Sequence, residues 1–337
     1  MNNSINSEFK DQYLLDDNKL KPCDIILTTT TQKVSKLIRI ATGGEYSHAI
    51  LYVGGHSCID STTNGVQAHN IQRMLFDSPE FCKVLRYKDS IEPKSIESII
   101  DFARAKVGTA YSVPEAIQAG IKIKDDIKER NRQFCSRLVA QAYHNNGFDI
   151  VKNPNYSTPE EINKSDKLIE IENALRIAHP EEVKLALETN TILEKQENSQ
   201  NFILESTRKL LGVDIQTFEQ VGGIVLMFSA FDDEICRIFK ESGFLDLWKH
   251  DLEVNPWFYD YDKFLEHFKN SSQRKDIGQK QSVSELETKR RFETTLKTLK
   301  NGDSKMPLKT FKIQIELYEK LIELSNIRAN VWEQAKK

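Results

Sequence analysis

The sequence has little of several features that would assign it to a class of protein. Its 337 residues include five cysteines, which are scattered and form no CxxC pair, so neither a zinc ribbon nor a dithiol redox centre is indicated. The longest apolar run, residues 222–230, is about half of a bilayer span, so no transmembrane segment is predicted. A net charge of -3 gives no global electrostatic reason to bind nucleic acid, and we expect no nucleic-acid partner.

Targeting signals and common cofactor motifs are also missing. The first residues lack the basic stretch and apolar core of a signal peptide, which predicts a cytoplasmic protein with free thiols. Delivery as an effector by a dedicated secretion system stays open. There is no P-loop lysine motif, no GxGxxG, no HExxH and no EF-hand loop. We therefore expect no metal and no organic cofactor.

The length and the pattern along the chain predict two domains. Residues 1–20 are a polar lead-in. Short apolar runs between turns, followed by helical periodicity, indicate an α+β domain over 21–172, with an antiparallel sheet packed on helices. Residues 173–337 have helical periodicity and no strand pattern, so an all-α domain of unknown role should follow. Within it, the polar stretch 271–284 is predicted to be a loop.

The expected elements of the first domain follow from local patterns. Strands are expected at 24–28, 47–53, 57–61, 66–71 and 82–87, and helices at 34–40, 96–107 and 134–145. Glycine pairs and Asn-Gly turns separate the strands, so neighbouring strands should form hairpins.

Cysteine chemistry is the main candidate for an enzymatic function. A thiol attacks well only as a thiolate, which a helix N-terminus or a neighbouring imidazole favours. Cys135 begins the predicted helix 134–145, where backbone N–H groups favour negative charge. The other cysteines have weaker cases, because Cys58 and Cys82 lie in strands, Cys236 lies in an amphipathic helix and Cys23 precedes a strand.

One histidine and one aspartate are placed to assist such a thiol. His48 starts the predicted strand 47–53, and Asp60 lies on the strand that folds back beside it. Cross-strand neighbours of this kind can set a carboxylate against an imidazole nitrogen, which fixes the tautomer and supports the charged ring. The alternatives are a structural histidine and a solvent-facing aspartate.

These residues occur in an order that resembles a known family. The segments are Asp24-Ile25-Ile26-Leu27, Ser47-His48-Ala49-Ile50-Leu51-Tyr52-Val53-Gly54, Ile59-Asp60, Gly108-Thr109-Ala110-Tyr111 and Phe134-Cys135-Ser136-Arg137-Leu138-Val139. Over about residues 20–172 the chain resembles the circularly permuted papain-like branch of the NlpC/P60 superfamily. It looks most like the YiiX/YebB-like cysteine hydrolases and is more distantly similar to the lecithin:retinol acyltransferase group.

The resemblance implies a role for each matching residue. Cys135 would be the nucleophile, His48 the general base and acid, and Asp60 the residue that orients His48. Tyr111 matches a tyrosine that lines the family's site, and Ser47 and Ser136 would belong to the same substrate or oxyanion pocket.

The sequence departs from the family's pattern at several places. Cys23 stands where the family usually has a glycine, and Asp60 is shorter than the family's usual Glu or His. The insertion 113–133 would be a lid or a partner surface. The segment 157–171 resembles the family's closing segment.

The function predicted on this basis is hydrolysis of a peptide, amide or acyl bond through a thioester on Cys135. One alternative is an acyltransferase that uses the same Cys–His pair. Another is an inactive papain-like module in an effector-type protein whose residues 173–337 bind a protein partner. In that region, residues 222–231 are either a docking helix or a core helix. The aromatic residues Trp248, Trp257, Phe258 and Tyr259 either bind a ligand or pack a core.

Overall fold

The structure, a computed structural model, describes residues 12–29, 44–62, 65–109, 133–188 and 191–337. The chain divides into two compact units, Met1–Thr189 and Asn190–Lys337. Unit 1 combines antiparallel sheets with helices and unit 2 is helical, which confirms the predicted fold class. The division lies later than the expected boundary after residue 172. The cause is that a strand and a helix beyond that residue belong to unit 1.

Unit 1 is built on a six-stranded antiparallel sheet with the order β5-β4-β3-β2-β6-β7. The strands are β2 (Ile25–Thr28), β3 (His48–Gly54), β4 (Ser57–Thr62), β5 (Gly65–Asn70), β6 (Cys82–Tyr87) and β7 (Leu168–Glu170). The first five of these strands are those that the sequence predicts, within a residue or two. The helix expected at 34–40 and nearly all of the insertion 113–133 lie outside the described residues.

Two principal helices, α2 (Pro93–Ala105) and α4 (Cys135–His144), pack on one face of this sheet. Residues alternate in direction along β3: Ala49, Leu51 and Val53 join the cluster with these helices, whereas Ile50 and Tyr52 join a second cluster on the other face. Gly108 closes the segment after α2 with φ +88°, a conformation that glycine accepts without strain. The sheet carries His48 and Asp60, and α4 carries Cys135.

The described part of the expected polar lead-in, residues 12–20, contains a strand, whereas residues 1–11 lie outside the described residues. Strand β1 (Tyr13–Leu15) pairs with β8 (Leu175–Ile177) in a separate two-stranded sheet. Leu14, Leu15 and Leu20 are buried, and Leu15 and Leu20 belong to the second cluster. The apolar run Leu14-Leu15 is too short to show the alternation that indicates a strand, so β1 is not predicted from the sequence.

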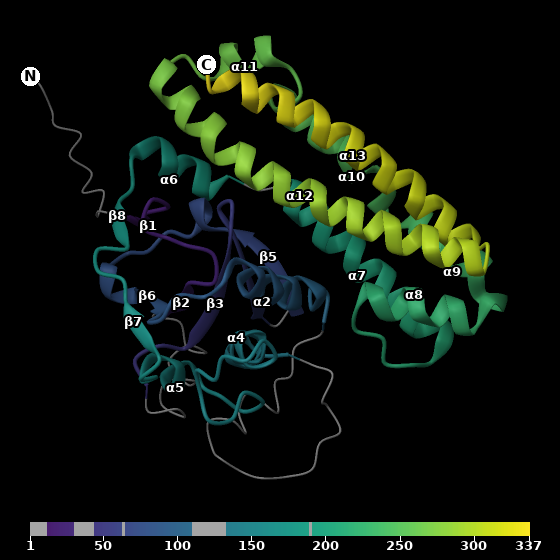
Figure 1. Cartoon of the computed structure of the whole chain (residues 1–337), viewed down its shortest axis with the longest axis horizontal. Helices are drawn as coiled ribbons and strands as arrows, with labels where there is room; N and C mark the ends of the chain where they lie inside the picture. The colour runs from purple at the N-terminus through teal and green to yellow at the C-terminus, as the bar shows by residue number, and fades with distance from the viewer. Residues whose placement is uncertain (1–11, 30–43, 63–64, 110–132, 189–190) are drawn as a thin grey trace, which may run out of the picture. The chain divides into compact units, whose positions relative to one another are not determined.

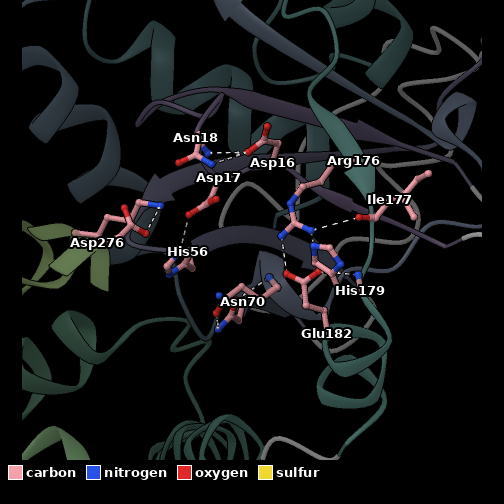
Figure 2. Close-up of polar contacts among 12 residues, drawn as sticks. Asp16, Asp17, Asn18, His56, Asn70, Arg176, Ile177, His179, Glu182 and Asp276 are labelled. Carbon is pink, nitrogen blue, oxygen red and sulfur yellow. Dashed lines mark hydrogen bonds and ion pairs between the residues drawn. The ribbon is translucent and has the colours of Figure 1, made fainter. Parts of the chain in front are cut away.

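Polar contacts fix this second sheet to the rest of unit 1. His56 Nε2 lies 3.1 Å from Asp17 Oδ2, and Arg176 makes a paired ion bridge to Glu182 on helix α6 (Pro180–Leu187), as Figure 2 shows. Arg73 of the short helix η1 (Ile71–Arg73) donates to the carbonyl of Leu185 at 2.9 Å. Of these contacts, the Arg73 bond ties α6, which lies beyond residue 172, to the segment after β5.

Unit 2 consists of helices only among its described residues. They are α7 (Thr191–Leu211), α8 (Phe218–Met227), η3 (Ser229–Phe231), α9 (Asp232–Glu241), η4 (Phe244–Asp246), α10 (Leu247–Val254), η5 (Pro256–Phe258), α11 (Tyr261–His267), α12 (Ser271–Lys305) and α13 (Lys309–Ala335). The long helices α12 and α13 run side by side (Figure 1). Across the described ranges of the chain, no helix is both long enough and apolar enough to cross a membrane.

The predicted loop at 271–284 is wrong, because these residues form the start of α12. Their contact with α13 uses small residues instead of an apolar stripe. A Cβ on Gly278 would lie 2.9 Å from the Cβ of Ala335 and 3.0 Å from the carbonyl oxygen of Trp332. The helix is thus held by close backbone approach, which a search for apolar periodicity does not detect.

The structure shows how residues 222–231 and the aromatic residues between 248 and 259 are packed in unit 2. Helix α8 buries Val221 and Val225 in a core cluster, although Met227 at its end and Phe228 beyond it are exposed. Trp257 and Phe258 pack against the cluster around Phe264 and Trp332, with Phe258 and Trp332 ring centroids 5.4 Å apart. Core packing therefore accounts for Trp257 and Phe258. Of residues 222–231, Ile224, Val225 and Phe231 pack in or against the core, whereas residues 226–230 are exposed.

Candidate active site

Helix α4 presents Cys135 as its first residue. Phe134 precedes it in an extended conformation, with φ -134° and ψ 161°, and has no polar atom in its side chain to cap the helix. The first N–H groups of a helix have no partner within the helix, and together with the dipole they favour a negative charge. The end of α4 that carries Cys135 is therefore suited to a thiolate.

Both ends of α4 are tied to neighbouring segments. At the first turn, Ser136 Oγ donates to the carbonyl of Ser157 at 2.7 Å, and Ser157 Oγ donates back to the carbonyl of Ser136 at 3.0 Å. At the other end, the Tyr143 hydroxyl donates to the carbonyl of Cys23, just before β2, at 2.5 Å. These bonds fix the position of Cys135 relative to the sheet.

The segment that leads into β3 is held by helix α5 (Pro159–Asn163). The backbone N–H of Glu45 donates to Glu160 Oε2 at 3.0 Å, and Lys164 pairs with Oε1 of the same carboxylate at 3.0 Å. A Cβ on Gly44 would come within 2.7 Å of Glu160 Cβ, so only glycine permits this approach. The anchor lies four residues before His48.

His48, Asp60 and Cys135 form one hydrogen-bonded constellation. His48 Nε2 lies 2.7 Å from Asp60 Oδ2, and the His48 ring also shares a hydrogen bond with the Cys135 side chain. Because a carboxylate accepts, Nε2 carries a proton, and Nδ1 is left to accept a proton from the thiol. Backbone N–H groups of Ala49 and Ser136 donate to the Cys135 sulfur.

The environment of Cys135 favours its thiolate. Burial by itself would raise the pKa of the thiol, but the positive charge of His48 and the hydrogen bonds from His48, Ala49 and Ser136 outweigh burial and lower this pKa. The Cys135 residue is 6% exposed. Both shifts favour a thiolate on Cys135 and a protonated ring on His48.

The pKa values of His48 and Asp60 are also shifted, each toward the charged form of the side chain. Burial would lower the pKa of His48, but the Cys135 thiolate and the hydrogen bond to Asp60 raise it well above its ordinary value. Burial would raise the pKa of Asp60, but hydrogen bonds from His48 and His69 hold it below its usual range. The contacts with the two histidines thus favour the ionised form of Asp60.

The other four cysteines differ from Cys135. All five cysteines are free thiols and buried. Burial raises the pKa of Cys23 to about 12 and raises those of Cys58, Cys82 and Cys236 as well. Cys135 alone among the five has a lowered pKa.

The remaining predicted site residues have mixed outcomes. The Ser136 side chain is used in the bond to Ser157, and its backbone N–H faces the Cys135 sulfur. Ser47 is buried, and its hydroxyl donates to the carbonyl of Thr28 at 3.5 Å. Both hydroxyls thus contact backbone carbonyls and hold the surrounding segments. Tyr111 lies outside the described residues.

Cys23, which stands where the family usually has a glycine, adopts a backbone conformation typical of glycine. Cys23 has φ +74°, the left-handed conformation that a glycine would adopt without cost. In a residue with a Cβ this conformation carries strain of order 1–3 kcal/mol. The shorter Asp60 side chain reaches His48 directly.

Sequence reasoning missed His69, whose Nε2 lies 2.9 Å from Asp60 Oδ1. β4 and β5 pair with Asp60 opposite Gln67 and Cys58 opposite His69, so Asp60 and His69 are diagonal neighbours on one face. The Asn64-Gly65 pair in the sequence indicates a hairpin between the strands that carry Asp60 and His69, but only the exact register brings the two side chains together. Among the residues that the structure describes, no group of three or more His, Cys, Asp or Glu side chains is arranged to hold a metal ion.

A family model describing permuted papain-like amidase enzymes, the YaeF/YiiX or C92 family, matches residues 19–211. This covers more than half of the chain, and the chain belongs to this family. The class is therefore an amidase or peptidase on a permuted papain-like fold.

One solved structure similar to this chain is the crystal structure of metalloprotein yiiX from Escherichia coli O157:H7. It shares 16% sequence identity, with 48% of this chain and 99% of that chain covered, at a TM-score of 0.37. A search of curated proteins finds no match.

Proposed function

We propose that this protein hydrolyses amide bonds through a covalent thioester on Cys135. The single observation that carries the proposal is the hydrogen-bonded arrangement of Cys135, His48 and Asp60 at the start of α4, which favours the Cys135 thiolate. A buried cysteine without a catalytic role has no need of such an environment. The membership of the amidase family supports the same chemistry.

In the acylation step, the Cys135 thiolate attacks the carbonyl carbon of the amide. A C–S bond forms and the carbonyl electron pair moves to oxygen, which gives a tetrahedral oxyanion. When this intermediate collapses, the C–N bond breaks and the His48 imidazolium gives its proton to the departing amine. The products are a thioester on Cys135 and a free amine.

Deacylation uses the same groups in reverse. Neutral His48 removes a proton from water, the resulting hydroxide attacks the thioester, and the C–S bond breaks to release a carboxylic acid. Asp60 holds the ring and stabilises its charged form in both steps. N–H groups at the start of α4, including that of Cys135, are the proposed donors to the oxyanion.

An acyltransferase would share every step up to the thioester. The two activities differ only in whether water or an amine resolves the intermediate, so one experiment can address both. A protein partner for residues 173–337 stays a prediction, and no contact in the structure identifies one.

The test uses p-nitrophenyl acetate as an acyl donor and a panel of aminoacyl and peptidyl p-nitroanilides as amides. We expect a burst of p-nitrophenol, an acetyl thioester on Cys135 found by peptide mass, and release of acetate into water. Hydroxylamine and glycinamide, added separately, measure the partition between water and amines. Acetate that is released at a similar rate with and without these amines defines a hydrolase.

The control variants distinguish the proposed site from other thiols. Cys135→Ala and His48→Ala should abolish the burst, whereas Cys82→Ala removes a buried thiol of the same unit and should leave it intact. An undiminished burst in Cys135→Ala would overturn the assignment of the nucleophile. Acetyl transfer to glycinamide without release into water would replace hydrolysis by acyl transfer.

A further inference from the structure

The Asp60 carboxylate is held from two sides. Oδ2 lies 2.7 Å from Nε2 of His48, and Oδ1 lies 2.9 Å from Nε2 of His69. The side chain of Asp60 is 7% exposed, so it is shielded from water that would otherwise satisfy its oxygens. A buried carboxylate with both oxygens bonded has one fixed plane.

The sheet register produces this arrangement. His48, Asp60 and His69 lie on three consecutive strands, β3, β4 and β5, in the order of the sheet. His69 faces Cys58 across the strand pair and reaches diagonally to Asp60. The side chain of His69 is 41% exposed and that of His48 is 24% exposed, so Asp60 is the most buried member of the row.

We propose that His69 is a positioning residue of the Cys135 site, which acts by fixing the plane of the Asp60 carboxylate so that Oδ2 meets Nε2 of His48. The proposal rests on the proposed function of Cys135 and His48. Without the bond from His69, Oδ1 loses a donor and the carboxylate can rotate about its Cβ–Cγ bond. His48 then loses the aligned acceptor that supports its charged form.

The titratable groups next to Asp60 all interact with its negative charge. His48 and His69 both lower the pKa of Asp60, and Asp60 in turn raises the pKa of Cys58 on the same strand. The His48 ring contacts both Asp60 and Cys135. Loss of the hydrogen bond between His69 and Asp60 should therefore make the His48 imidazolium less stable. The pKa of the Cys135 thiol should rise as a result.

Two polar variants separate positioning from bulk packing. His69→Gln places an amide nitrogen near the position of Nε2, so it can still donate to Oδ1. His69→Asn has the same chemistry, but its amide ends near the position of Nδ1 and falls short. Both keep a polar side chain on a strand position that is partly exposed, so both variants should fold.

The measurement is the rate of carboxymethylation of Cys135 by iodoacetamide across pH, read by peptide mass in the full-length protein. His69→Asn should move the midpoint upward and slow the reaction at about pH 6 on the order of tenfold. His69→Gln should stay within roughly threefold of the wild-type rate. His144→Asn removes a ring from another His–Asp pair in unit 1, at the far end of α4, and should leave the profile unchanged.

Two results overturn the positioning role. One is a His69→Asn profile equal to that of the wild type, and the other is an equal loss in both His69 variants. Failure of the underlying function has a different signature. In that case wild-type Cys135 would titrate as an ordinary thiol and His48→Ala would change nothing.

Discussion

His48 Nε2 lies 2.7 Å from Asp60 Oδ2 while the same ring contacts Cys135, so one imidazole joins a carboxylate to a thiol. His48 and Asp60 come from the hairpin of β3 and β4, whereas Cys135 comes from the first turn of α4, much later in the chain. The thiolate is stabilised on one side by the ring and on the other by backbone N–H groups of Ala49 and Ser136.

Replacing Asp60 by Asn should weaken His48 as a base without unfolding unit 1. Asn keeps the shape but removes the charge and can hold the ring in the wrong tautomer. We expect the rate of acetyl thioester formation from p-nitrophenyl acetate to fall on the order of 10- to 1000-fold. Asp17→Asn is the matched control, because Asp17 pairs with His56 elsewhere in unit 1. Equal rates in wild type and Asp60→Asn would contradict this role.

Labelling should be selective among the five cysteines. At about pH 6, iodoacetamide should modify Cys135 and leave the other four thiols unmodified, since their pKa values are raised by burial. Peptide mass after digestion gives the modified fraction at each position. Comparable labelling of Cys236, the cysteine of unit 2, would show that Cys135 has no special environment.

Much of the site could be predicted from the sequence, for a physical reason. The hairpin from β3 to β4 fixes which residues face each other, so His48 and Asp60 were expected as neighbours. Cys135 was expected at a helix start because the apolar pattern of α4 begins there. His69 was missed because its diagonal contact with Asp60 depends on the exact β4–β5 register, which the sequence alone does not specify.

The errors in the fold have equally specific causes. Strand β1 is three residues long and owes its place to burial of Leu14 and Leu15 against distant segments. Helix α12 has a polar first half that packs through Gly278 and Ser282, which an apolar stripe would not indicate. In both places tertiary contacts decide the structure where the local pattern is weak.

Gly278→Ala should destabilise unit 2. The new methyl group would meet Ala335 Cβ at 2.9 Å and the Trp332 backbone at 3.0 Å, which should cost about 1–3 kcal/mol of unfolding free energy. Gly222→Ala on α8 meets nothing within 4 Å and should instead gain about 0.5–1 kcal/mol from helix propensity. All three tryptophans lie in unit 2, so fluorescence during urea unfolding reports this unit. Equal midpoints in the two variants would contradict the close approach.

Removing only one partner of the Glu285–Arg328 ion pair should lower the free energy of unfolding of unit 2 substantially. Arg328 Nε and Nη2 each lie 2.8 Å from a Glu285 oxygen, and both side chains are largely buried. Arg328→Leu leaves a buried carboxylate and should cost about 3–5 kcal/mol, whereas the double variant Glu285→Met/Arg328→Leu should cost less. Urea unfolding followed by tryptophan fluorescence measures both. A double variant less stable than Arg328→Leu would contradict the account.

The most direct test of the Cys–His site is the rate of Cys135 alkylation by iodoacetamide between about pH 4 and 10, in the wild type and in His48→Ala. The lowered pKa of Cys135 means that the thiolate is present above that pKa and is lost as pH falls through it. The account predicts a wild-type midpoint well below the ordinary thiol value of about 8.5, and a midpoint at or above that value in His48→Ala, where burial alone remains. A wild-type midpoint near the ordinary value, unchanged by the histidine substitution, would contradict it.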